Sequence, residues 1–187
     1  MPQKSFKAND LPSSFRDPSG SVYSFNGEIF RRINPVYKDS YEMLMSSGLY
    51  HKLVEKRYLV PHQEIKIKDK TVYKIIEPKT IPFVSYSYEW CFSQFKDAAF
   101  LTLQIQKLAM EFGMSLKDAT SFNIQFEGGK PILIDTLSFE KYVEGKPWIA
   151  YKQFCEQFLA PLTLMVDKDI NLSKLLIPFA GSIPLDL

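Results

Sequence analysis

The sequence has few cysteines and histidines, and it lacks a long hydrophobic run. Small secreted domains usually carry several closely spaced cysteines, so Cys91 and Cys155, far apart in the chain, favour a reducing cytoplasm. Neither these thiols nor His51 and His62 fall at a metal-ligand spacing, which argues against a structural metal. The longest apolar run, residues 159–166, is far shorter than the ~20 residues that a membrane-spanning helix needs. A soluble cytoplasmic protein without a membrane span is therefore expected.

The sequence also lacks a strong excess of charge of one sign. It has 23 Lys and Arg against 21 Asp and Glu, a net charge of +2. Proteins that bind nucleic acids usually carry a strongly basic domain or stripe, so we expect no nucleic-acid partner. Hydrophobic residues make up 45% of the 187 residues, which is typical of a folded globular chain rather than a disordered one. The aromatic content of 14% is unusual, but composition alone indicates no function.

Two hairpins and a helix are predicted for the first half. Residues 1–15 are polar and form a lead-in segment. Two β-prone runs flank Asn26-Gly27, a pair that favours a type I′ hairpin turn. Apolar residues then recur at helical spacing over about residues 40–57, and alternation over residues 63–76 predicts a second hairpin. Residues 16–80 are therefore expected to form a small antiparallel sheet with one inserted helix, like the N-lobe of a kinase.

Helices dominate the predicted second half, residues 81–187. A helix is expected over about residues 91–112, followed by a hairpin between residues 123 and 135 and a helix over about residues 147–165 with a kink at Pro161. The order is thus sheet and helix, a connector, then helices with an embedded hairpin. We predict an α+β fold with two lobes, similar to that of protein kinases.

The embedded hairpin carries the strongest candidate site. Asp118 precedes Asn123 by five residues, and Asp135 follows twelve residues later at the end of the returning strand. Because the two strands are antiparallel, Asn123 and Asp135 should meet at the same end of the hairpin, within reach of Asp118. Mg²⁺ prefers such oxygen ligands and completes its shell with phosphate and water. We therefore predict a magnesium–phosphate site.

The spacing and the strand context resemble the catalytic loop of protein kinases and small-molecule phosphotransferases. The resemblance implies that Asp118 orients or deprotonates a hydroxyl, and that Asn123 and Asp135 bind magnesium. The sequence departs from kinases at Leu116, where a histidine is common, and after Asp135, where Thr136-Leu137 replaces Phe-Gly. The alternative is purely structural: Asp118 caps a turn, and the other two residues begin and end strands.

Candidate nucleotide contacts lie in the first half. A Gly-rich phosphate loop is missing, and the predicted loop contains only Gly20. Arg31 or Arg32 occupies the place of the kinase lysine that contacts ATP, with Lys74 as a weaker candidate. Glu42 is the expected ion-pair partner on the helix, and Glu55 is the second choice. Glu77 begins the connector, where adenine would bind. For both arginines a solvated strand face is the alternative.

The connector, residues 82–90, is rich in aromatic side chains. It could form the wall of a base or substrate pocket, since aromatic rings stack on nucleobases. The alternative is that these rings belong to the core.

Three runs support a narrower resemblance: residues 83–97, 113–126 and 134–140. They are similar to the N-terminal region of bacterial class I S-adenosylmethionine-dependent methyltransferase-like proteins, some of them called nodulation-protein-like. The resemblance implies a methyltransferase domain downstream, where S-adenosylmethionine would bind. The present chain contains no strand with a Gly-rich turn and helix for that cofactor. We therefore expect it to be the N-terminal fragment of a longer bacterial protein.

These features define three hypotheses. The chain is a kinase-like domain that binds Mg-ATP and phosphorylates a small-molecule, sugar or lipid hydroxyl. Alternatively, it is a non-catalytic, pseudokinase-like module that binds a substrate or a partner for the methyltransferase domain. The third hypothesis is an unrelated α+β interaction domain.

Overall fold

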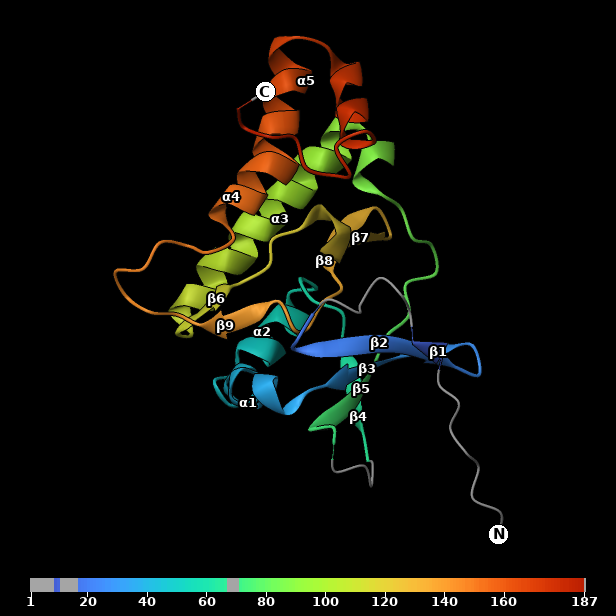
Figure 1. Cartoon of the computed structure of the whole chain (residues 1–187), viewed down its shortest axis with the longest axis vertical. Helices are drawn as coiled ribbons and strands as arrows, with labels where there is room; N and C mark the ends of the chain where they lie inside the picture. The colour runs from blue at the N-terminus through green and yellow to red at the C-terminus, as the bar shows by residue number, and fades with distance from the viewer. Residues whose placement is uncertain (1–8, 11–16, 67–70, 187) are drawn as a thin grey trace. The chain divides into compact units, whose positions relative to one another are not determined.

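The computed structural model describes residues 9–10, 17–66 and 71–186. Contacts within the chain divide it into two units, whose elements are labelled in Figure 1. The sheet unit comprises residues 1–42 and 61–80, and the helical unit comprises residues 43–60 and 81–187. The predicted α+β class is confirmed, with an antiparallel sheet in one unit and helices plus an embedded hairpin in the other. Among the described residues, no helix has the length and apolar character needed to cross a membrane.

The sheet unit is built on a five-stranded antiparallel sheet. The hairpin predicted at Asn26-Gly27 is confirmed: the two residues have φ values of 52° and 85°, as a type I′ turn requires. The kinase-like order also predicts a first strand over residues 14–17, of which residues 14–16 lie outside the described residues. The strands, in sheet order, are β1 (Asn9–Asp10), β2 (Gly20–Phe25), β3 (Glu28–Ile33), β5 (Lys74–Pro78) and β4 (His62–Ile65).

The second hairpin is shifted relative to the prediction. β4 pairs with β5 from Ile65 opposite Ile75 to His62 opposite Pro78. Glu77 therefore lies inside β5, opposite Gln63, and the expectation that it begins the connector is wrong. Pairing with β4 keeps the backbone extended through Pro78, so the connector starts later. The sequence also predicts a turn at residues 69–70 between these two strands, and those residues lie outside the described part of the chain.

The single helix predicted for residues 40–57 is instead two helices. After a short 3₁₀ turn, η2 (Pro35–Tyr37), α1 covers Lys38–Ser46 and α2 covers Leu49–Glu55. Gly48 separates them with φ of 88°, a left-handed conformation that ends one helix and is strained for residues with a side chain. α2 buries Leu49 and Leu53 in the core of the helical unit. The apolar pattern of the sequence therefore continues past Gly48, although the helix does not.

The long helix of the helical unit is α3 (Phe92–Glu111), which is followed by Gly113 with φ of 72°. It buries Phe95 and Ile105 completely, whereas Leu103, which the helical apolar pattern predicts to be buried, is 42% exposed. Next comes β6 (Met114–Leu116), which pairs with β9 (Phe139–Lys141). This short antiparallel pair was not predicted.

The predicted embedded hairpin is confirmed. It consists of β7 (Ile124–Glu127) and β8 (Lys130–Leu133), paired from Ile124 opposite Leu133 to Glu127 opposite Lys130. Gly128 and Gly129 form the turn, both with positive φ. A 3₁₀ turn, η4 (Ser121–Asn123), leads into the hairpin.

The C-terminal helix differs most from its prediction. α4 (Tyr151–Phe154) begins four residues after the expected start and continues through a π-helical segment, η5 (Cys155–Leu159), into α5 (Ala160–Asp167). Pro161 lies in the first turn of α5 and has no N–H to donate to the preceding turn, which explains the widened segment before it. Figure 1 shows this helix beside α3, and a last 3₁₀ segment, η6 (Ile170–Leu176), follows.

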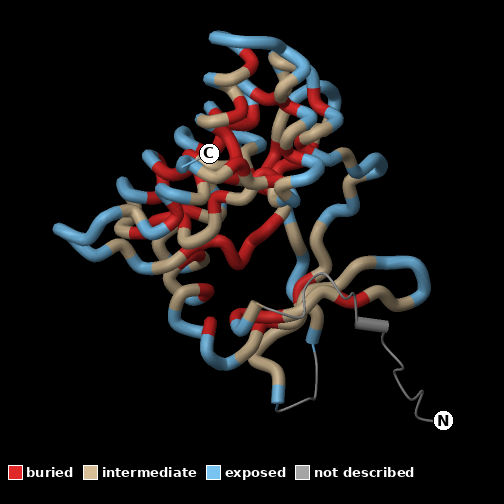
Figure 2. Tube along the Cα trace, turned by 45° about the horizontal axis from the view of Figure 1, so that its top comes forward, coloured by how far each residue is buried: buried red, intermediate tan, exposed pale blue. Residues whose placement is uncertain are grey.

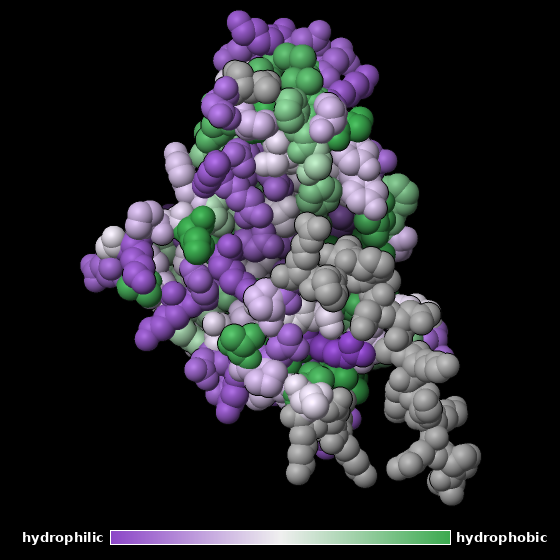
Figure 3. Space-filling model, viewed as in Figure 1, coloured by the Kyte–Doolittle hydropathy of each residue, from purple (hydrophilic) through white to green (hydrophobic). Residues whose placement is uncertain are grey.

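Aromatic side chains fill much of the core of the helical unit, whose buried segments are red in Figure 2. The connector is partly core and partly surface. It contains a 3₁₀ turn, η3 (Ser87–Glu89), after which Trp90 packs edge-on against Phe95 and Phe126. In contrast, Phe83 is 74% exposed. On the face drawn in Figure 3, hydrophobic residues form separate patches among hydrophilic ones.

Candidate functional site

The embedded hairpin places the predicted catalytic and metal-binding residues of the helical unit at one end. Asn123 is the last residue of η4, directly before β7, and Asp135 follows the end of β8. The Ile134 N–H donates to the Asn123 carbonyl at 2.8 Å and closes this end of the hairpin. Asp118 lies in the loop between β6 and η4. The antiparallel pairing thus explains the positions of Asn123 and Asp135.

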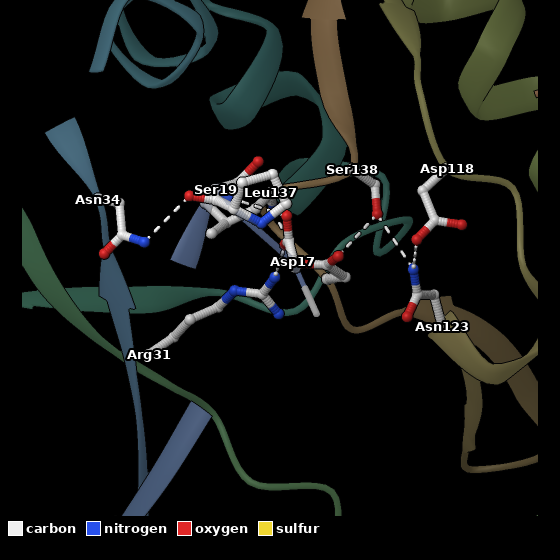
Figure 4. Close-up of polar contacts among 10 residues, drawn as sticks. Asp17, Ser19, Arg31, Asn34, Asp118, Asn123, Leu137 and Ser138 are labelled. Carbon is white, nitrogen blue, oxygen red and sulfur yellow. Dashed lines mark hydrogen bonds and ion pairs between the residues drawn. The ribbon is translucent and has the colours of Figure 1, made fainter. Parts of the chain in front are cut away.

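A fourth residue, Ser138, connects these side chains (Figure 4). Asn123 Nδ2 donates to Asp118 Oδ2 and to Ser138 Oγ, both at 3.2 Å. Ser138 Oγ in turn donates to Asp135 Oδ2 at 3.0 Å. The structure therefore brings the three predicted residues into one hydrogen-bonded chain, while their catalytic and metal-binding roles stay predictions.

The hydrogen bonds fix the orientation of the Asn123 amide. An ionised Asp118 carboxylate only accepts, so the nitrogen of the amide must face it. The amide oxygen, Oδ1, then points away from Asp118 and Ser138. The amide oxygen is therefore not used in either of these two contacts, and amide oxygens are among the ligands that bind hard cations in proteins.

Both carboxylates are held by further donors. Asp135 is buried, with 7% of its surface exposed, and its Oδ1 accepts from the Leu137 N–H at 2.8 Å. Asp118 Oδ1 accepts from the Thr120 N–H at 3.1 Å and from Gln153 Nε2 at 2.9 Å. These donors hold both carboxylates in fixed positions.

Two glutamines from the C-terminal helix position the loop, and the sequence analysis missed them. Gln153 accepts from the Ala119 N–H at 2.7 Å while it donates to Asp118. Gln157 Oε1 accepts from Thr120 Oγ1 at 2.8 Å and from the Ser121 N–H at 2.9 Å. These partners are more than thirty residues apart in the chain, and no local pattern marks them.

The oxygen atoms of this site fit magnesium only as part of its shell. Asn123 Oδ1 and the Asp135 carboxylate are the hard oxygen ligands that Mg²⁺ prefers. The described residues contain no group of three or more His, Cys, Asp or Glu side chains that could hold a metal. A phosphate-bearing ligand and water would have to supply the other positions, which is how Mg²⁺ usually binds.

In the sheet unit, Arg31 and Arg32 lie on opposite faces of β3. Arg31 Nη2 donates to Asp17 Oδ2 at 3.0 Å, and Asp17 Oδ1 accepts from the Ser19 N–H at 2.9 Å (Figure 4). The Arg32 guanidinium lies 4.4 Å from the centre of the Tyr23 ring, a cation–π contact. Arg31 thus fixes the turn before β2, and a phosphate contact for either arginine stays a prediction.

The expected ion pair between Glu42 and one of these arginines is wrong. Glu42 instead accepts from the Tyr73 hydroxyl at 2.7 Å and lies 3.9 Å from Lys38 Nζ. Lys38 belongs to α1 and Tyr73 directly precedes β5. The Glu42 carboxylate therefore links α1 to the start of β5, and among the described residues it forms no ion pair with β3. Binding of a nucleotide by Glu42 or Glu77 stays a prediction.

Comparison with known proteins shows a similarity to a curated protein. The chain is similar to the nodulation protein NoeA of Rhizobium meliloti (strain 1021), with 36% identity over 166 residues. The match covers 86% of this chain and 34% of NoeA, so the chain spans about a third of that relative's length. Among solved structures, it matches vaccinia related kinase 3 with a TM-score of 0.44 and 10% identity, over 72% of this chain and 47% of the kinase. No family model matches.

Proposed function

We propose that the chain is a kinase-like domain that binds a magnesium nucleotide at Asp118, Asn123 and Asp135. Asn123 Oδ1 and the Asp135 carboxylate would hold Mg²⁺, which would neutralise phosphate charge. Asp118 would orient an acceptor hydroxyl and accept its proton. The acceptor would be a small molecule, a sugar or a lipid headgroup.

The hydrogen-bonded chain from Asp118 through Asn123 and Ser138 to Asp135 is the observation that supports this proposal most strongly. In the purely structural alternative, Asp118 caps a turn while Asn123 and Asp135 begin and end strands, and these tasks do not require the three side chains to be connected. Here the buried Ser138 hydroxyl and the fixed Asn123 amide hold two carboxylates in a defined relation. This arrangement suits two acids with different tasks, one at the metal and one at the hydroxyl.

A non-catalytic module is the second candidate function. Asp118 accepts three hydrogen bonds from within the chain, from Thr120, Asn123 and Gln153. A carboxylate used in this way can serve as a rigid structural acceptor. Such a domain would bind a nucleotide or a partner without phosphate transfer.

Thermal unfolding in the presence of MgATP tests the proposal. A ligand at 100 times its dissociation constant should stabilise the protein by about 2.7 kcal/mol. Asp135→Asn should abolish the shift, while Asp167→Asn, an exposed residue at the end of α5, should leave it unchanged. Ser138→Ala keeps both carboxylates but removes their link, and it should weaken the shift.

The outcomes separate the two candidates. A shift that depends on Asp135 together with phosphate release or transfer supports a kinase, and Asp118→Asn should then stop turnover without loss of binding. A shift without turnover supports the non-catalytic module. Absence of a shift with MgATP and other magnesium nucleotides would rule out nucleotide binding.

We also propose that this domain works in a longer protein with a methyltransferase part, which would bind S-adenosylmethionine. The resemblance described for residues 83–97, 113–126 and 134–140 motivates this step. The test is to purify the longer protein, and a form of it that lacks the present residues, and to measure S-adenosylmethionine binding to each. If S-adenosylmethionine bound equally well to the present residues alone, the proposal of a separate methyltransferase part that binds it would be contradicted.

A further inference from the structure

A cavity lies within the helical unit, beside β6. Its volume is about 620 Å³, which falls in the range of small-molecule sites. It lies between the C-terminal half of α3, the β6–β9 pair and the loop before α4. Its lining residues are Gln106, Met110, Ser115, Glu140, Lys141, Tyr142, Val143, Lys146, Pro147, Trp148 and Ile149.

Glu140 carries the negative charge of this cavity. In the β6–β9 pair it lies opposite Ser115, on the same face, and both residues line the cavity. The Ser115 hydroxyl is already engaged by the Gln106 side chain at 3.0 Å. Glu140 is intermediate in exposure, and among the described residues its carboxylate has neither a hydrogen-bond donor nor an ion-pair partner within contact distance. A carboxylate partly removed from water is stabilised by a cation.

Aromatic and apolar side chains form the rest of the wall. Trp148 is held by its indole N–H, which donates to the Leu116 carbonyl at 2.7 Å, and its ring lies 5.7 Å from that of Phe154. Met110 and Val143, at 44% and 45% exposure, add apolar surface without a neighbour to cover it. A fixed indole ring beside a carboxylate is a favourable setting for an organic cation.

The two lysines of the lining do not contradict a cationic ligand. Lys141 and Lys146 are exposed, so water solvates their ammonium groups. Glu140, in contrast, is only partly exposed and has no hydrogen-bond or ion-pair partner among the described residues. The unmatched charge that the cavity itself holds is therefore negative.

We propose that this cavity binds a small organic cation, a protonated or quaternary amine on an apolar body. The cation would pair with Glu140, and its apolar part would lie against Trp148 and Met110. The inference does not depend on the proposed nucleotide site, because it uses different residues and a ligand without phosphate.

Three probes of similar size and different charge test the proposal: benzyltrimethylammonium, benzyl alcohol and phenylacetate. Amide and indole N–H signals of the ¹⁵N-labelled chain report binding, and Trp148→Phe identifies the Trp148 indole signal. We expect benzyltrimethylammonium to shift the signals of Trp148 and Ser115, with an affinity about tenfold above that of benzyl alcohol. The signal of Trp90, which is 4% exposed in the core, should not move.

Glu140→Gln and Glu144→Gln form a matched pair of variants. Glu144 is an exposed carboxylate on the adjacent loop and does not line the cavity. Glu140→Gln should remove the preference for the cation over benzyl alcohol, and Glu144→Gln should preserve it. The spectra also show directly that each variant is folded.

Three results would overturn the proposal. The first is tighter binding of phenylacetate that is lost in Lys141→Gln or Lys146→Gln, since the cavity would then select anions. The second is an unchanged cation preference in Glu140→Gln. The third is the absence of Trp148 shifts with all three probes.

Discussion

Lowering the pH below 6.5 should destabilise the protein through His62. Burial lowers the pKa of this histidine to about 4, with the negative charge of Glu64 opposing the shift and Lys74 adding to it. The Tyr41 hydroxyl lies 2.9 Å from His62 Nε2 and donates to Glu64 Oε1 at 3.0 Å. Since Tyr41 has one proton, which it gives to Glu64, His62 Nε2 must donate to the Tyr41 oxygen. His62 is therefore neutral and protonated at Nε2 at pH 7.

The sign and size of the effect follow from proton linkage. An unfolded histidine with a pKa of 6.5 binds a proton between pH 6.5 and 4, whereas the folded one, with a pKa of about 4, does not. Stability is therefore lost as the pH falls, by about 2.5 kcal/mol between pH 7.5 and 4.5. Glu64 acts later: burial tends to raise its pKa, but hydrogen bonds from Lys74 and Tyr41 outweigh this and lower it. The stability that Glu64 contributes is lost only when the pH falls below 4.5, the ordinary pKa of a glutamate.

Urea denaturation at pH 7.5, 5.5 and 4.5 measures this loss. Wild type should lose about 1.4 kcal/mol by pH 5.5 and about 2.5 kcal/mol by pH 4.5 from this histidine. The amide of His62→Gln can still donate to Tyr41. In this variant the loss of unfolding free energy from pH 7.5 to each lower pH should be smaller than in wild type by these amounts. The matched control is His51→Gln, because His51 is exposed on α2.

Two results would refute the reasoning. One is a stability–pH curve of His62→Gln that runs parallel to that of wild type. The other is an NMR titration in which the His62 ring takes up its proton near pH 6.5 in the folded state.

Two further predictions concern packing in the helical unit. A methyl group at Gly181 would lie 2.6 Å from ring carbons of Phe122, whereas Gly129 also has positive φ but open space around it. Gly181→Ala should therefore lower the free energy of unfolding by about 1–3 kcal/mol more than Gly129→Ala, and equal losses in urea denaturation would contradict this. Gln157→Leu keeps the volume but removes the acceptor for the buried Ser121 N–H. We expect a loss of about 2–3 kcal/mol in the same assay, and a loss below about 0.5 kcal/mol would show that water or another group replaces Gln157.

The hairpins could be predicted because their determinants are local. Asn26-Gly27 and Gly128-Gly129 supply the positive φ values that two-residue turns require, and the flanking alternation sets the strands. The position of Asn123 beside Asp135 follows directly from this pairing. Most of the candidate site was therefore accessible from sequence.

Features that depend on distant contacts were not accessible. The strands β6 and β9 have three residues each and pair across the whole embedded hairpin, so neither has a pattern of its own. Gln153 and Gln157 hold the Asp118 loop from a helix that begins some thirty residues later. Ser138, the link between Asn123 and Asp135, follows the hairpin without any motif.

Predicted element boundaries and side-chain partners were wrong where backbone conformation, strand pairing or nearby side chains outweighed the sequence pattern. Gly48 lies inside an apolar pattern of helical period, yet its left-handed backbone divides the helix. Glu77 stays in β5 because β4 pairs with it as far as Pro78. Glu42 was matched with an arginine on the basis of a kinase-like order, whereas Tyr73 and Lys38 lie closer.

The π-helical segment Cys155–Leu159 has a consequence for sequence alignment. Its hydrogen bonds join residues five apart rather than four, so the segment takes up one residue more than a regular helix of the same height. A related protein that lacks one residue here would keep a continuous α-helix and still place the counterparts of Phe154 and Met165 on the buried side. A single-residue gap in this segment should therefore be read as an exchange of helix type and not as a shift of the core.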